Sequence, residues 1–189
     1  MGFWDVLRGQ ERRRGPNLDN LFAVPGAAVT LQTSLGLAPT GVGSVCFRAA
    51  EGSASAATEA DAVALVEADD GPAVERSVDS YGFTWLVLRT TPDDVSGLVT
   101  DLHGVNTALE SQGFATGLLC SVVGFADASG RRLGLVYLYR RGTFYPFAPT
   151  GPQQRDTLWE RQVRDTLGSD LTIEPDLSRW MPLWGAPGL

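Results

Sequence analysis

A long amphipathic stretch from Asp93 to Gln112 sets the first limits on the fold. Its apolar residues recur at helical spacing and form one stripe: Val95, Leu98, Val99, Leu102, Val105 and Leu109. A helix with such a stripe is stable when the stripe packs on another apolar surface. Asp93 and Asp94 stand where the helix dipole favours carboxylates, and Gly113 follows where helices commonly end. The pattern therefore predicts a helix lying on a core.

The chain that follows this helix predicts a surface for it to cover. Residues 118–126 and 132–140 have strong β composition, and the segment between them, Asp127 to Gly130, has a common hairpin length. We expect these two strands to pair antiparallel. The same criteria predict earlier strands at residues 44–49, 74–80 and 83–90, the last two forming a hairpin around Tyr81 and Gly82.

Capping and helix-breaking residues mark further helices. They are expected at residues 17–22 and 27–36, with Pro25 and Gly26 interrupting between them, from Thr58 to about Asp69, and from Pro152 to Leu167. Residues 143–149 are aromatic but contain two prolines, so they should form an edge strand or a packed loop. The Trp- and Pro-rich tail, residues 174–189, is expected to lie extended across the domain and bury its rings.

These elements do not alternate as in a doubly wound parallel sheet. The expected order is α-β-α-β-β-α-β-β-α, which indicates an α+β fold. We expect an antiparallel sheet of about five strands with helices mainly on one face, followed by the extended tail. At the level of fold alone, this order is similar to that of type III secretion chaperones and YbjN-like proteins.

The first sixteen residues look separable from a single α+β domain at residues 17–189. Phe3, Trp4 and Leu7 share one helical face, and Arg8 begins a run of arginines, which is typical of a short anchor on an anionic membrane. Docking of this helix on the domain or on a protein partner is the alternative. The chain shows no secretory signal and no long apolar run, so we expect a cytoplasmic protein, with peripheral contact at the inner face of the cell membrane as one option.

The net charge argues against a nucleic-acid partner. Its formal value is −7, whereas proteins that bind nucleic acid draw much of their affinity from cations that neutralise phosphates. All fifteen basic residues are arginine, which is consistent with codon bias in a GC-rich genome. Because a Walker A motif requires lysine, this route to nucleotide binding is closed.

No catalytic or metal-binding set emerges, and no cofactor is predicted. His103 is the single histidine and lies at the edge of the amphipathic stripe, where a partly buried structural role is usual. Cys46 and Cys120 lie in apolar strand sequence and are expected to be free, buried thiols, since a disulfide would require their strands to be neighbours. Asn106 falls inside the stripe, and a structural hydrogen bond to a neighbouring loop is favoured there over contact with a ligand.

An arginine–aromatic corner is the best candidate for a binding surface. Tyr139, Arg140, Arg141 and Tyr145 combine two fixed cations with two aromatic rings where a strand ends. Arginine recognises anionic groups through bidentate hydrogen bonds and stacks on planar ones. The corner could therefore bind a small anionic ligand or the acidic face of a partner, and a purely structural corner is the alternative.

Several distinctive strings resemble the PspAB family, the PspA-associated proteins of actinobacteria. The resemblance runs over nearly the whole chain, and the strings are Asn17-Leu-Asp-Asn-Leu-Phe22, Ala28-Val-Thr-Leu31, Pro39-Thr-Gly-Val-Gly-Ser-Val-Cys-Phe-Arg48, Asp79-Ser-Tyr-Gly82, Arg140-Arg-Gly-Thr-Phe-Tyr-Pro-Phe-Ala-Pro149, Leu177-Ser-Arg-Trp180 and Trp184-Gly-Ala-Pro-Gly188. The resemblance implies an accessory protein of the phage-shock system, in which PspA responds to membrane damage. It implies no enzymatic activity and supplies no catalytic residues. The expected partner is PspA or a membrane-associated stress protein.

Overall fold

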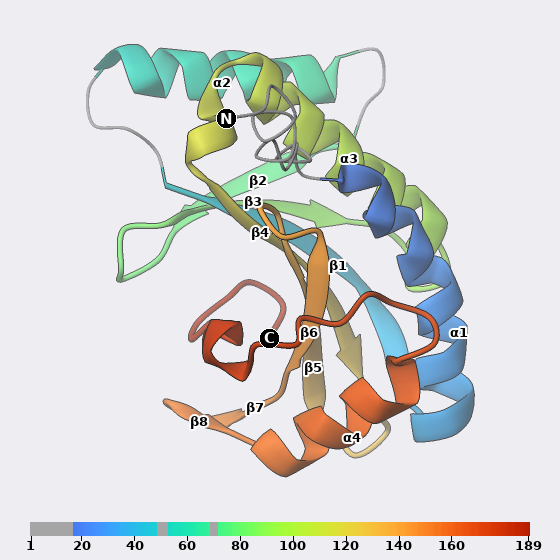
Figure 1. Cartoon of the computed structure of the whole chain (residues 1–189). Helices are drawn as coiled ribbons and strands as arrows, with labels where there is room; N and C mark the ends of the chain where they lie inside the picture. Colours follow the sequence, from blue (N-terminus) through green and yellow to red (C-terminus); the bar gives the residue numbers. More distant parts are fainter. Residues whose placement is uncertain (1–16, 49–52, 69–71) are drawn as a thin grey trace, which may run out of the picture.

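The fold is built on one antiparallel sheet of six strands in the order β2-β3-β1-β4-β5-β6 (Figure 1). The computed structural model describes residues 17–48, 53–68 and 72–189. The strands are β1 (Ala38–Phe47), β2 (Val74–Val78), β3 (Thr84–Arg89), β4 (Leu118–Ala126), β5 (Arg132–Leu138) and β6 (Thr143–Phe147). A separate two-stranded ribbon joins β7 (Pro149–Gly151) to β8 (Gln154–Arg155).

Helices cover one face of this sheet (Figure 1). They are α1 (Val24–Leu35), α2 (Ser53–Glu67), α3 (Val95–Ser111) and α4 (Thr157–Leu167), with short 3-10 turns η1 (Leu18–Ala23), η2 (Phe114–Thr116) and η3 (Leu177–Arg179). In α3 the buried residues are those of the predicted stripe apart from the half-buried Val95, with Asn106 and Ala108 in addition. The central helix was therefore predicted with the correct inner face.

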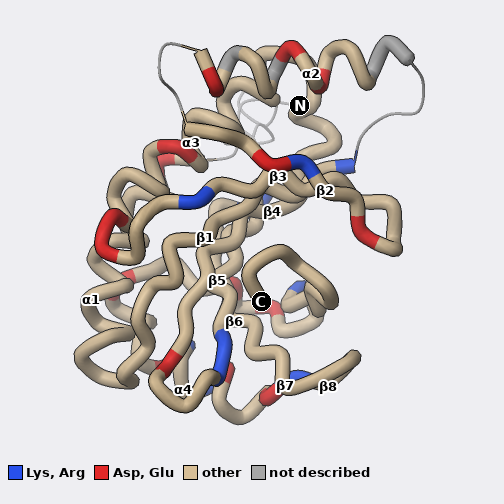
Figure 2. Tube along the Cα trace, turned by 180° about the vertical axis from the view of Figure 1, so that it is seen from behind, with Lys and Arg blue, Asp and Glu red and all other residues tan. Residues whose placement is uncertain are grey.

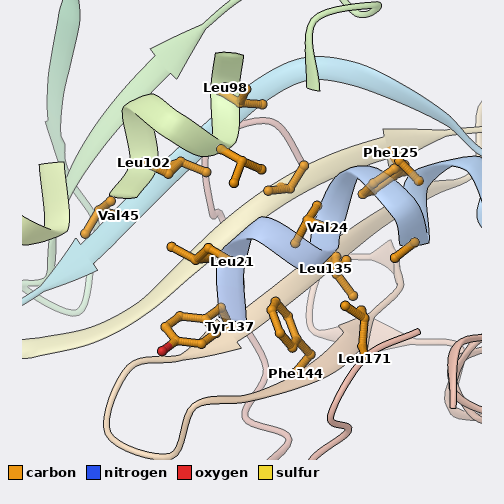
Figure 3. Packing of buried hydrophobic residues seen from close by; sticks show 14 of the residues in the cluster. Leu21, Val24, Val45, Leu98, Leu102, Phe125, Leu135, Tyr137, Phe144 and Leu171 are labelled. Carbon is orange, nitrogen blue, oxygen red and sulfur yellow. The ribbon is translucent and has the colours of Figure 1, made fainter. Parts of the chain in front are cut away.

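Helix α3 approaches the sheet closely at a glycine of β1. A Cβ atom placed on Gly43 would lie 3.0 Å from Cδ1 of both Leu98 and Leu102, so a larger residue there would require these two side chains to shift. Close by, side chains of η1 and α1 pack onto the strands, as Leu21 and Val24 do in Figure 3. The helix-side core is thus continuous from α3 across α1 to β6.

The opposite face of the sheet is covered by the C-terminal tail (Figure 1). Trp180 is 7% exposed, stacks on Tyr145 with ring centroids 5.9 Å apart, and donates from Nε1 to the Glu174 carbonyl. The Trp184 ring meets Phe147 edge-on at 5.2 Å. The tail therefore buries aromatic rings against the sheet, as its composition predicted, but it is not extended throughout, because residues 177–179 form η3 and further turns follow.

The two ends of the sheet differ. At β6 residues 172–174, which follow α4, lie alongside, because the amide of Phe144 donates to the Thr172 carbonyl and the Phe144 carbonyl accepts from the Glu174 amide. At the other end β2 pairs with β3 alone, and four of its five residues are exposed. Glu75 on this strand pairs with Arg89 at 2.9 Å.

The α+β class, the antiparallel sheet and the helical face are confirmed, and some details differ. The sheet has six strands because the aromatic segment forms β6, the edge strand that was one of its two expected states. Pro25 does not interrupt a helix. It occupies the first turn of α1, where a missing amide hydrogen costs nothing, so the helix begins at Val24. Pro152 does not open the last helix, since residues 149–155 form the β7–β8 ribbon and Asp156 caps α4.

Candidate binding groove

A large apolar groove lies on the tail side of the sheet. Its volume is about 1290 Å³, and it runs between the end of the tail at one wall and the β2–β3 turn at the other. Ten of its twenty lining residues have large apolar or aromatic side chains: Tyr81, Phe83, Trp85, Phe114, Leu119, Leu138, Tyr145, Met181, Leu183 and Trp184. Binding sites are commonly concave and apolar with few polar groups, so this groove is the candidate functional site.

The floor of the groove comes from the central strands. Cys46 of β1, Trp85 of β3 and Cys120 of β4 point to this side because side chains alternate along a strand. Cys46 is the register partner of both Trp85 and Cys120. The floor is therefore a continuous row across three strands.

A β-bulge shapes one end of the groove. Cys46 pairs with Cys120, yet the next residue, Phe47, pairs with Leu118, so Leu119 is the extra residue on β4. Leu118 is then buried on the helix side, while Leu119 and Cys120 both line the groove. Bulges re-aim side chains in this way and are frequent beside functional sites. Leu119 remains 37% exposed at the groove edge.

The opposite wall is the β2–β3 turn, held by Asp79. Its carboxylate accepts hydrogen bonds from Trp85 Nε1 at 2.9 Å and from the amides of Tyr81 and Phe83 at 2.9 and 3.0 Å. Burial acts to raise the pKa of Asp79, but these hydrogen bonds outweigh it and hold the pKa below its ordinary value. Asp79 thereby fixes both the turn and the Trp85 ring in the floor.

Charged groups lie at the margin of the groove and not in its floor. The Arg48 guanidinium lies 5.2 Å from the centroid of the Phe83 ring, a cation–π contact. Asp79 in the β2–β3 turn lines the same groove, and Figure 2 shows acidic and basic positions next to each other along β2, outside the groove lining. The margin therefore carries both signs of charge, which suits recognition of a partner with polar groups around an apolar centre.

The predicted arginine–aromatic corner is divided between the two faces of the sheet. Tyr139 lies in the helix-side core, where its hydroxyl donates to Glu110, and burial together with this bond raises its pKa. Tyr145 lies in the tail-side core, where its hydroxyl donates to the Met181 carbonyl at 2.8 Å. Of the four predicted residues, Tyr145 lines the groove.

The two arginines of that corner are engaged within the chain. Arg140 donates to the Thr116 carbonyl. Arg141 donates from Nε to Glu174 Oε2 at 3.2 Å, and Thr143 donates to the same oxygen at 2.7 Å. Burial acts to raise the pKa of Glu174, while the bonds from Thr143 and Arg141 lower it below its usual range. These contacts favour the structural alternative for the corner, and binding of a ligand there stays a prediction.

Of the remaining candidate residues, the structure describes His103 and Asn106 but not those of the N-terminal segment. Phe3, Trp4, Leu7 and Arg8 lie outside the described residues. His103 is partly buried, with its ring 4.9 Å from that of Phe22 and its Nε2 3.4 Å from Asp19. Asn106 donates to Ser121 Oγ at 2.9 Å and to the Leu102 carbonyl, a structural bond to strand β4 where a loop was expected.

The part of the chain that the structure describes contains no group of three or more His, Cys, Asp or Glu residues able to hold a metal ion. Nor does any helix in this part combine the length and hydrophobicity needed to cross a bilayer. Cys46 and Cys120 are both free and buried, as expected, although their strands are neighbours.

Sequence reasoning did not find the groove. Its floor was visible as strand residues, but no local pattern shows which residues of separate strands become neighbours. Leu119 was assigned to a regular strand, and the bulge that turns it toward the groove depends on pairing with β1. The Trp- and Pro-rich tail was the available signal, since an irregular segment rarely covers a sheet face completely.

Comparison with known proteins gives a family and no further relatives. Neither a curated protein nor a solved structure matches the chain, so the likeness to type III secretion chaperones and YbjN-like proteins stays a prediction. The family described as PspAB, PspA associated protein B, matches residues 1–188. The match spans the amphipathic N-terminal segment, the sheet and the tail. The chain belongs to the PspAB family.

Proposed function

We propose that this protein is a non-enzymatic adaptor of the phage-shock response to envelope stress that binds PspA directly through the apolar groove. The family description supports an association with PspA. The observation that carries the proposal is the groove itself, whose edges expose Tyr81 at 54%, Leu119 at 37% and Met181 at 58%. Exposed apolar patches of this kind mark sites of protein contact.

The occupant we assign to the groove is an apolar segment of PspA with polar flanks. The floor offers rings and aliphatic side chains, which recognise apolar side chains by burial. Arg48 and Asp79 at the margin offer opposite charges, which set orientation more than affinity. Several described titratable groups have structural partners, as in Asp79 with Trp85 and Glu174 with Arg141, and this supports a role without catalysis.

The test is a titration of purified PspA into the full-length protein by calorimetry, with a matched pair of variants. Leu119→Asp places a charge at the groove edge and should weaken binding by about tenfold or more, ~1.4 kcal/mol. Leu158→Asp makes the same change at a site 79% exposed on α4, away from the groove, and should leave binding unchanged. Equal binding by both variants, or none by the unchanged protein, contradicts the proposal.

We place the protein in the cytoplasm, with peripheral membrane contact through Phe3, Trp4, Leu7 and Arg8. The amphipathic pattern of this segment supports the contact. Co-sedimentation with vesicles containing anionic lipid should fall for a chain that begins at Asn17, while its binding to PspA is retained. Equal co-sedimentation of the two chains removes the membrane role of the segment.

A further inference from the structure

Two cysteines of separate strands lie side by side in the floor of the groove. Cys46 of β1 and Cys120 of β4 are register partners, and both line the groove. Both thiols are free, and the residues are only 3% and 5% exposed. Two thiols therefore share one small area of an otherwise apolar surface.

The register brings the two thiols within hydrogen-bond contact but does not favour a disulfide between them. The Leu119 carbonyl accepts from the Tyr139 amide on the β5 side, so the backbone groups of Cys120 face β1. In such a pair, whose backbones are hydrogen-bonded to each other, the Cα atoms lie about 5.5 Å apart. The Cβ atoms are farther apart than in a non-hydrogen-bonded pair. A disulfide requires Cβ atoms about 3.5–4.5 Å apart. A direct S–S bond at this register thus strains the strands, whereas a centre bonded to both sulfurs is compatible with the wider Cβ separation.

The surroundings restrict what that bridging atom can be. A hydrogen bond with Cys120 and burial both raise the pKa of the Cys46 thiol, so it is protonated and a poor target for peroxide. Two sulfurs alone do not supply the four ligands of a structural zinc site. The apolar floor also penalises a buried charge. The pair suits a soft centre that binds two sulfurs and leaves a neutral product.

We propose that Cys46 and Cys120 form a dithiol site for a thiophilic centre with one apolar substituent, of the class of monosubstituted trivalent arsenicals. With phenylarsine oxide, two As–S bonds form and the As=O bond breaks. The two thiol protons leave with the oxygen as one water molecule, and arsenic keeps its oxidation state. The phenyl group then occupies the groove beside Leu119 and Leu183.

Intact mass spectrometry of the full chain tests the site. One equivalent of phenylarsine oxide in excess monothiol should give a single adduct, with the mass of the reagent less one water. The adduct should persist in the monothiol and be removed by 2,3-dimercaptopropanol, because two bonds must be exchanged together. Cys46→Ala and Cys120→Ala should each abolish the persistent adduct. Loss of the wild-type adduct to the monothiol, or its persistence in either variant, overturns the proposal.

A second measurement uses the unchanged protein, in case a variant fails to fold. After loading with phenylarsine oxide, both cysteines should resist alkylation while the near-UV circular dichroism stays that of the folded protein. Loading that occurs only in denaturant, or that abolishes this signal, contradicts a site in the folded groove. Rapid closure of a Cys46–Cys120 disulfide by diamide in the folded protein contradicts the register argument. None of these outcomes depends on PspA, so the test is separate from that of the proposed function.

Discussion

The two faces of the sheet are covered in different ways. On one face α3 and α1 present regular stripes of apolar residues, and six of the residues that α3 buries there are fully enclosed at 0% exposure. On the other face an irregular tail covers the sheet with a few large rings, chiefly Trp180 and Trp184. Periodic helices fill the space above strands continuously, whereas a tail interrupted by prolines leaves part of its face open. The groove is the part that the tail leaves open.

This difference implies that the two faces contribute differently to stability and to binding. The helix side should carry most of the stability and tolerate little truncation, because close-packed interiors do not relax into cavities. The tail side should contribute less stability per residue and should control access to the groove. Substitutions on the two faces therefore have different expected effects. Measuring these effects tests whether the two faces contribute differently to stability.

The largest expected effect is on the helix side. Leu102→Ala removes a side chain enclosed between α3 and β1, and we expect the free energy of unfolding to fall by about 4 kcal/mol. Urea denaturation measures it. Thr107→Ala, exposed on the same helix, is the control and should cost no more than about 0.5 kcal/mol. A loss near the control value for Leu102→Ala would show that this face is loosely packed.

An intermediate effect is expected from the tail. Trp180→Ala removes the ring on Tyr145 and the bond to Glu174, and we expect a loss of about 3 kcal/mol, at the low end for tryptophan because the tail can settle over the gap. The groove should widen, so fluorescence of an apolar dye bound there should rise. An unchanged dye signal together with full loss of stability would mean that Trp180 supports the core and has no influence on the groove.

The smallest of these effects is a dependence on pH at the groove wall. The pKa of Asp79 is lower in the folded state than in the unfolded chain, so its stabilisation is complete above the unfolded value of about 4. It is lost as pH falls from there through the lower folded pKa. Asp79→Asn should cost about 1 kcal/mol at pH 7 and flatten the decline of stability below pH 4. Thermal denaturation from pH 7 to pH 3 compares the two proteins, and identical slopes would exclude this role of Asp79.

The elements that could be predicted from the sequence were those defined by local periodicity. The stripe of α3 and the hairpin of β4 and β5 can be recognised from local sequence alone, because the direction of each side chain follows from the backbone repeat. Pro25 and Pro152 were misjudged for a related reason. Proline shows that a helix interior is disfavoured, but not whether the position falls in a first turn or in a preceding ribbon.

The candidate site could not be predicted in this way, since it depends on pairing between strands that are distant in sequence. Tyr139 and Tyr145 are neighbours in sequence but lie on opposite faces, because the turn between β5 and β6 offsets their alternation. Cys46 and Cys120 are distant in sequence but meet across β1 and β4. Only the register decides both outcomes, and the register of a sheet is a property of the whole core.

The open edge at β2 has a consequence for how the protein behaves at high concentration. Strand-to-strand association needs unpaired backbone groups, and among the described strands of the main sheet the β6 edge already holds residues 172–174 alongside it. Among the described strands of this sheet, β2 is therefore the edge more open to an incoming strand. There the Val74 amide already donates to the Glu67 side chain and Arg76 pairs with Glu59, so α2 covers part of this edge. In the part of the chain that the structure describes, two carboxylates of α2 thus hinder edge-to-edge association at β2.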